Sequence, residues 1–208
     1  MQCLSVLIGK PEKTPAKSGL TGFFKKPVST AYIGKMGLEG DHIVDQQHHG
    51  GVDQAVYVFG DNDRIWWAQA LDRDLPAGFF GENLLISDLE TGRLAVGDVL
   101  ELGSATLQIT SPRIPCATYA AHIGTGDAIK QFYAAERPGV YARVLKAGIA
   151  AAGDHVALTP YPGIRITMIE VMRHYLRKYD DHAFLARLLH TPAHHKMHEL
   201  ARERLGKP

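Results

Sequence analysis

VGDVLELGSATLQITSPRIPC, residues 96–116, contains two short runs of apolar and β-branched residues set between glycine-centred turns. These runs, 98–102 and 106–110, are predicted to be strands. Two prolines then fix the backbone on either side of Arg113 and place Cys116 near the start of a short helix. The stretch predicts a turn-rich β body in which a strand leads directly into a chemically reactive segment.

The same texture extends over residues 1–162, where short β-like runs are broken by Gly, Pro and Asp. Helical patterns interrupt it three times, and the first of them starts with aspartates that could cap it. Strands and helices do not alternate regularly, which argues against a doubly wound parallel sheet. We expect an α+β fold, a mostly antiparallel β-barrel-like body with inserted helices. The predicted strands are 2–8, 30–35, 55–59, 83–86, 98–102, 106–110, 139–145 and 155–159, and the predicted helices are 61–71, 115–122 and 127–136.

A second texture begins after the body, over residues 164–208. Thr167 can cap a first helix, Asp180 or Asp181 a second, and Pro192 suits the first turn of a third. This segment has nine Lys or Arg against five Asp or Glu, which makes it basic and leaves residues 1–163 slightly acidic. The sequence therefore predicts a body over 1–163 and a small three-helix C-terminal domain over 164–208.

Composition limits the function classes. The 208 residues are 45% hydrophobic and 22% charged, which is typical of a folded domain. A formal net charge of +1 gives no overall field for nucleic acid or acidic lipid, so neither partner is expected. The two cysteines form no disulfide framework, and no signal peptide or run of 18 apolar residues is present. We expect a cytoplasmic protein that does not span a membrane.

Three glycine motifs combine glycine with acidic or amide residues: GLEGD at 37–41, HGGVD at 49–53 and FGENL at 80–84. Glycine lets the backbone approach a ligand closely while nearby polar side chains point toward it. The alternative is a simple turn, which is the favoured interpretation for Gly40-Asp41 and Gly97-Asp98. For residues 49–53 both interpretations remain open, and neither nucleotide-binding glycine motif occurs in the chain.

Cys116 follows the two prolines and Arg113. Free amides at the start of a helix and a nearby guanidinium both lower a thiol pKa and favour the thiolate, a nucleophile and soft-metal ligand. The alternative is a buried, inert cysteine. We interpret Cys116 as functional, because packing alone does not explain the arginine and the prolines, and Cys3 as part of the core.

Four histidines near the C-terminus, His190, His194, His195 and His198, include a four-residue spacing that could form a metal site on one helix face. Pro192 interrupts a continuous helix there, and no nearby acidic residue or cysteine completes the ligand set. Solvated or helix-end histidines are therefore favoured over a metal site.

The motifs in their order resemble one family. GLEGD (37–41), HHGGVDQAVYVF (48–59), FGENL (80–84), VGDVLELG (96–103) and QITSPRIPC (108–116) resemble a MOSC domain, the module named for the C-terminal part of molybdenum cofactor sulfurases. The similarity is strongest to the bacterial YiiM branch, in which a helical 3-alpha domain follows, as residues 164–208 would here. SGLTGFFKKPV (18–28) resembles the early lysine-containing loop of that branch.

The resemblance implies a molybdenum cofactor (molybdopterin) held in the body, with Cys116 as both metal ligand and catalytic residue. It implies reduction of N-hydroxylated compounds, such as 6-hydroxylaminopurine, to amines, with electrons from a separate donor protein; pyridoxal phosphate is not expected. Arg113, a lysine and loop amides are suited to the cofactor phosphate, and an Asn–Asp pair to the pterin edge. The positions assigned to cofactor binding are Lys25 (or Lys26), His49, Gly50, Gly51, Asp53, Asn83 and Arg113.

Three other functions remain open. The domain could carry sulfur or the cofactor on Cys116 without turnover. It could be a cysteine-dependent hydrolase with His49 as the base. The C-terminal helices could also read nucleic acid as a helix-turn-helix, the least favoured alternative because no recognition face rich in Arg and Lys is evident.

Overall fold

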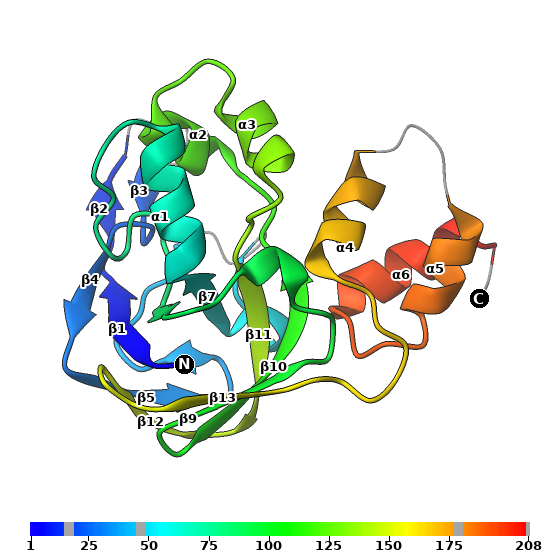
Figure 1. Cartoon of the computed structure of the whole chain (residues 1–208), viewed down its shortest axis with the longest axis horizontal. Coiled ribbons are helices and arrows are strands. Elements are labelled where there is room, and N and C mark those ends of the chain that lie inside the picture. Colours follow the sequence, from blue (N-terminus) through cyan, green and yellow to red (C-terminus); the bar gives the residue numbers. More distant parts are fainter. Residues whose placement is uncertain (15–18, 45–48, 177–180, 207–208) are drawn as a thin grey trace.

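A computed structural model describes residues 1–14, 19–44, 49–176 and 181–206. Figure 1 shows a β-rich body, with helices above the sheet, and three further helices on one side of it. His48 and Ser18, which begin two of the motifs, lie outside the described residues. The α+β class predicted from the sequence is confirmed.

One eight-stranded sheet forms the body, in the order β13-β9-β10-β11-β7-β8-β1-β4. All neighbouring strands are antiparallel except β7 and β8. Strand ladders do not close this sheet into a barrel, but an isolated bridge between Gln2 and His155 connects the start of β1 to the start of β13. The strands are β1 Cys3–Gly9, β4 Lys25–Val28, β7 Val56–Gly60, β8 Leu84–Ile86, β9 Val99–Leu102, β10 Ala105–Pro112, β11 Val140–Lys146 and β13 Val156–Thr159.

Two small sheets complete the body. The first has the order β12-β5-β6 and the second pairs β2 with β3. Every strand predicted from the sequence is present, but the two-residue strands β2, β3 and β6 and the longer strands β4 and β12 were not predicted. β4 begins Lys-Lys-Pro and β12 contains only glycine, alanine and one isoleucine, compositions that are depleted in strands. The bounds are β2 Glu12–Lys13, β3 Leu20–Thr21, β5 Thr30–Gly34, β6 Gly37–Leu38 and β12 Gly148–Ala151, and two 3-10 turns occupy η1 Val52–Gln54 and η2 Thr91–Arg93.

Three helices are inserted in the body, as predicted: α1 Asp61–Ala70, α2 Ala117–Ile123 and α3 Ala128–Ala135. The prediction of an aspartate cap on α1 is wrong, because Gly60 occupies the cap position without a side-chain bond. Asp63 is instead fully buried and accepts hydrogen bonds from Thr91 and Arg137. The Asp63 side chain thus bonds the η2 turn and the segment before β11, rather than the start of α1.

The C-terminal segment forms α4 Met168–Tyr175, α5 His182–Leu188 and α6 His195–Arg204. Thr167 caps α4 through a reciprocal capping box with Glu170, and Asp181 caps α5. Asp180, the alternative cap, lies outside the described residues. The predicted start of the third helix is wrong: Pro192 precedes the helix, and the His194 side chain caps α6 by accepting from the Lys196 amide.

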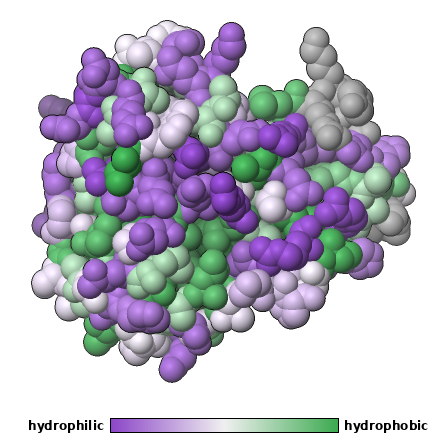
Figure 2. Space-filling model, in the orientation of Figure 1, coloured by the Kyte–Doolittle hydropathy of each residue, from purple (hydrophilic) through white to green (hydrophobic). Residues whose placement is uncertain are grey.

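The core extends from the sheet into these helices. One hydrophobic cluster includes β10 residue Leu107, α4 residue Val171 and α5 residue Leu188. Ion pairs from Arg173 to Glu136 and from Arg165 to Asp98 join the segment to the body. Figure 2 shows that hydrophilic residues cover much of the middle of this face of the molecule. The boundary at residues 163 and 164 stays a prediction.

Within the described residues, no helix has the length and apolar character needed to cross a membrane.

Candidate functional site

A cavity of about 240 Å³ lies where β10 leads into α2, beside the loops around residues 41–44 and 49–54. Six of the eight site residues predicted from the sequence line it. The exceptions are Gly51 and Asp53. The predicted residues on its wall are Lys25, His49, Gly50, Asn83, Arg113 and Cys116, and side chains from Phe23, Asp41, Gln54, Tyr57 and Tyr141 join them.

Cys116 occupies the N-cap position of α2, directly after the proline-rich segment, and is half-buried. An Arg113 Nη2 lies 3.7 Å from its sulfur. Burial alone would raise the pKa of the thiol, but a hydrogen bond with His49, the Arg113 charge and the Tyr119 amide lower it to about 6. Cys116 is therefore mainly a thiolate at neutral pH.

Cys3 provides a contrast within the same chain. It is fully buried in β1, and burial together with Asp154 raises the pKa of its thiol to about 11. Its assignment to the core is confirmed, and Cys116 is the cysteine that lines the cavity and has a lowered pKa.

Arg113 is buried and lines the cavity beside two aromatic rings, with its guanidinium carbon 5.0 Å from the Tyr57 ring centroid and 5.5 Å from that of Phe23. Its Nη1 donates to the Tyr141 hydroxyl at 2.7 Å. Its Nε has no partner among the residues that the structure describes, and the buried Oε1 of Gln54 is also unpaired there. The cavity is thus lined by two residues that each carry a buried polar atom without a partner among the described residues.

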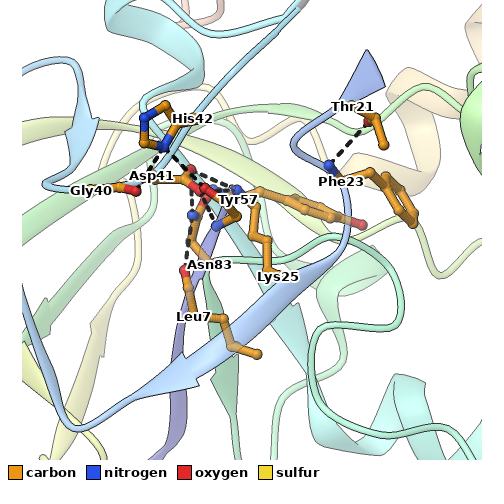
Figure 3. A network of polar contacts seen from close by, with 10 residues as sticks. Leu7, Thr21, Phe23, Lys25, Gly40, Asp41, His42, Tyr57 and Asn83 are labelled. Atoms are coloured by element: carbon orange, nitrogen blue, oxygen red, sulfur yellow. Dashed lines mark hydrogen bonds and ion pairs between the residues drawn. The ribbon is translucent and has the colours of Figure 1, made fainter. Parts of the chain in front are cut away.

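Lys25, Asp41 and Asn83 form a connected network at another side of the cavity (Figure 3). Lys25 Nζ donates to both Asp41 carboxylate oxygens at 2.5 and 2.6 Å, and Asn83 Nδ2 donates to Asp41 at 2.9 Å. Burial lowers the pKa of Lys25, while the Asp41 charge opposes that shift. The network fixes the loop after β6 against β4 and β8. Lys26, the alternative considered from the sequence, is exposed and does not line the cavity.

Asn83 uses most of its hydrogen-bonding capacity within the fold. Its Nδ2 also donates to the Leu7 carbonyl at 3.2 Å, and its Oδ1 accepts from the Tyr57 amide at 3.1 Å. Asn83 therefore positions the cavity wall, since both amide protons already have acceptors.

The backbone conformation at residues 50 and 51 requires glycine at both positions. Gly50 and Gly51 have φ values of 80° and 82°, a region that favours glycine. A Cβ on Gly50 would lie 2.9 Å from Ile43 Cδ1, so Gly50 lets this loop pack against the opposite wall. Gly81 serves a different purpose, because a Cβ there would lie 2.9 Å from the Phe23 ring.

Asp53 faces away from the cavity, toward the C-terminal helices. It accepts from Arg143 Nε, the His195 amide and His195 Nδ1, at 2.9, 2.9 and 2.7 Å. Burial would raise the pKa of this carboxyl, but the bonds from His195 and the Arg143 charge lower it. Asp53 therefore anchors the start of α6 to the body.

The sequence around the C-terminal histidines offers no carboxylate that would complete a metal site, but the fold brings Asp53 next to His194 and His195. Ligand atoms of Asp53, His194 and His195 lie within 4.8 Å of one another, whereas His190 and His198 are not in this group. These atoms already have protein partners: His194 Nδ1 accepts from the Lys196 amide, and Asp53 is paired with Arg143. His194 is buried, and burial lowers its pKa to about 4. His194 caps the start of α6 and His195 begins it, so these two histidines lie at a helix end.

The cavity residues that were not predicted as site residues include Gln54, Asp41, Tyr57 and Tyr141. Gln54 directly follows the HGGVD motif, and its position next to that motif was an available signal. Asp41 was interpreted as a turn residue, and it does close a turn, because its amide donates to Leu38. Tyr57 and Tyr141 face each other only because β7 pairs with β11 in the register that aligns them, which local sequence does not reveal.

Comparison of the sequence and the fold with known proteins identifies the family of this chain. Residues 45–157 match the MOSC domain. The uncharacterized protein YflK of Bacillus subtilis (strain 168) is 33% identical over 158 residues, 74% of this chain and 72% of YflK. A Gibberella moniliformis protein named Reductase is 29% identical over 161 residues, 76% of this chain and 29% of that protein. The crystal structure of YiiM from Geobacillus stearothermophilus superposes with a TM-score of 0.81 at 26% identity, covering 98% of both chains. The chain belongs to the MOSC domain family, in its YiiM branch.

Proposed function

We propose that this protein binds the molybdenum cofactor in the Cys116 cavity and reduces N-hydroxylated compounds to amines. The observation that supports this most directly is the pairing of a stabilised thiolate with a buried arginine whose Nε lacks a partner in the described chain. A thiolate suits a soft metal and a guanidinium suits a phosphate, so the donor set fits the cofactor. The relative named Reductase supports oxidoreductase chemistry at a coarser level.

In this proposal the roles of the site residues follow from which of them line the cavity. Cys116 would hold the metal, while Arg113 and the backbone at Gly50 would meet the anionic end of the cofactor. Gln54, with its unpaired Oε1, would accept from the pterin edge, the role first assigned to Asp53. Asp53 and Gly51 would not contact the cofactor, because they lie outside the cavity.

Each residue has a chemical task that follows from its surroundings. The bound cofactor would supply a metal that delivers two electrons to the substrate. Cys116 needs to lose no proton at pH 7 to become a ligand, because its thiolate already predominates. Arg113 offsets the negative charge of that thiolate, and the Lys25–Asp41 pair keeps the opposite wall rigid.

The electrons would come from a separate donor protein, and the substrate would be a small N-hydroxylated molecule. Their delivery completes the balance R–NHOH + 2e⁻ + 2H⁺ → R–NH₂ + H₂O. A cytoplasmic location belongs to the same proposal, because two unpaired cysteines suit a reducing compartment.

Metal analysis and turnover test this function. Protein made in cells with an intact cofactor pathway should contain molybdenum and reduce an aromatic hydroxylamine with a chemically reduced viologen as donor. Cys116→Ser should lose both, whereas Cys3→Ser, which changes the buried cysteine, should keep the molybdenum content. Wild-type protein without molybdenum, or Cys116→Ser with undiminished turnover, would contradict the proposal.

Mass spectrometry of the same samples separates the carrier function from the reductase. A persulfide on Cys116 without turnover of any hydroxylamine would favour a sulfur carrier. Loss of the extra sulfur on treatment with a thiol reductant would identify it as a persulfide.

A further inference from the structure

We propose that Tyr141 is the proton donor to the leaving oxygen when an N–O bond is cleaved in this cavity. The proposal rests on the reductase function above and assigns a role to a residue that neither the sequence motifs nor the family relationship identified.

Two tyrosines line the cavity, and only one has a proton to give. Tyr57 and Tyr141 are paired opposite each other in the β7–β11 register. The Tyr57 hydroxyl donates to the Pro138 carbonyl at 2.9 Å, so its proton is engaged. The Tyr141 hydroxyl accepts from Arg113 at 2.7 Å, and its own proton has no acceptor within the described part of the chain. Because the hydroxyl already accepts a strong hydrogen bond, its proton is directed elsewhere.

Arg113 places this proton near the reacting centre. One guanidinium nitrogen bonds the Tyr141 oxygen at 2.7 Å and the other lies 3.7 Å from the Cys116 sulfur. The phenol and the metal-binding sulfur are thus neighbours on one planar group. A general acid must come within hydrogen-bond reach of the atom it protonates, so the substrate would bind between the metal on Cys116 and the Tyr141 hydroxyl.

The charges around Tyr141 suit a hydroxyl that donates its proton and later regains it. Burial raises the pKa of Tyr141 and Arg113 opposes that rise, so the hydroxyl is protonated at neutral pH. Once the proton has left, the phenolate would keep a charge-assisted hydrogen bond from Arg113. The arginine therefore stabilises the product of proton donation without removing the proton beforehand.

The other titratable groups facing the cavity have different partners. Lys25 and Asp41 are paired with each other. His49 is hydrogen-bonded to the Cys116 thiolate, and His42 Nδ1 lies 3.0 Å from the Gly40 carbonyl. Compared with these groups, Tyr141 is a neutral acid whose proton has no acceptor among the described residues.

The step balances as follows. The N–O bond of R–NHOH breaks and two electrons enter from the donor protein. Tyr141 supplies one proton to the oxygen, which leaves as water, and solvent supplies a second proton to the nitrogen. Tyr141 then regains its proton from solvent through the open side of the cavity, so the cycle consumes two protons and two electrons for each amine formed.

The test compares Tyr141→Phe with Tyr57→Phe in protein loaded with cofactor in the cell. Both changes remove one hydroxyl from the same cavity and keep the ring. Tyr141→Phe should retain wild-type molybdenum content and KM, lose roughly 10²- to 10⁴-fold in kcat, and lose the fall in kcat at high pH. Tyr57→Phe should keep the wild-type pH profile, although it is expected to be less stable.

A second measurement does not depend on turnover. In cofactor-free protein, ultraviolet titration of the Cys116 thiolate in Tyr141→Phe should still show its midpoint near 6, because His49 and Arg113 remain. If that midpoint stays in place and molybdenum content is normal while kcat falls less than threefold, the inference is wrong and the reductase function stands. If wild type holds no molybdenum or reduces no hydroxylamine, both proposals are wrong.

Discussion

Replacing His49 by alanine should raise the pKa of the Cys116 thiol. His49 makes a hydrogen bond that lowers this pKa, and together with Arg113 it brings the value from 9.0 down to about 6 despite burial. A hydrogen bond to a charged group contributes about 1.5–3 kcal/mol. At about 1.4 kcal/mol per unit, its loss raises the pKa by roughly one to two units. The thiolate prevails at pH 7 in wild type, whereas in His49→Ala the pKa lies at roughly 7 to 8, so half or more of the Cys116 population is protonated at that pH.

Thiolate absorbance in the ultraviolet, followed against pH in cofactor-free protein, measures this directly. The rate of alkylation by iodoacetamide at fixed pH gives an independent readout. Cys3 does not interfere, because it is fully buried and its pKa is about 11. His155→Ala removes an exposed histidine of the body as a control. A midpoint for His49→Ala that equals the wild-type midpoint would refute the assignment of His49 as the stabilising partner.

Three further predictions concern stability and loading. Asp41→Asn leaves the buried Lys25 ammonium without its counter-charge, so urea denaturation should show a loss of about 3–5 kcal/mol. Gly50→Ala forces a side chain into a strained backbone region and against Ile43; we expect about 1–2 kcal/mol lower stability and reduced molybdenum content by metal analysis. The Asp53 carboxyl has a lowered pKa, so the stability it contributes is present near neutrality and lost as pH falls through that pKa. Asp53→Asn should therefore flatten the acid limb of the stability curve, as measured by thermal unfolding between pH 3 and pH 7; an unchanged acid limb would exclude this role.

Local sequence predicts those elements of this fold that have a local cause. Strands such as β7 and β10 are rich in β-branched residues and are bounded by turns, and the capping box of α4 is readable as Thr167 and Glu170. β4 was missed because its lysine pair and proline argue against a strand, yet pairing with β1 supplies its hydrogen bonds. Pairing between distant segments outweighed local preference there.

The cavity shows the same division. Cys116 and Arg113 were predicted because the features that mark them, two prolines and the start of a short helix, lie next to them in the sequence. Asp53 was assigned to the cofactor on its motif, but it binds His195, 142 residues away. Tyr141 was missed because its position depends on strand register. Contacts of this kind are set by the whole fold rather than by neighbouring residues.

The turn η1 links two regions that the motif pattern treats as separate modules. Its consecutive residues Asp53 and Gln54 face opposite ways, one toward the start of α6 and the other into the cavity. A chain cut after residue 163 would therefore not be a smaller working version of the protein. Such a cut would expose the Asp53 carboxylate and loosen the turn that places Gln54 in the cavity. The C-terminal helices therefore stabilise the cavity wall through the contact between Asp53 and His195. Exchange of this segment between relatives should succeed only when the Asp53 and His195 positions are exchanged together.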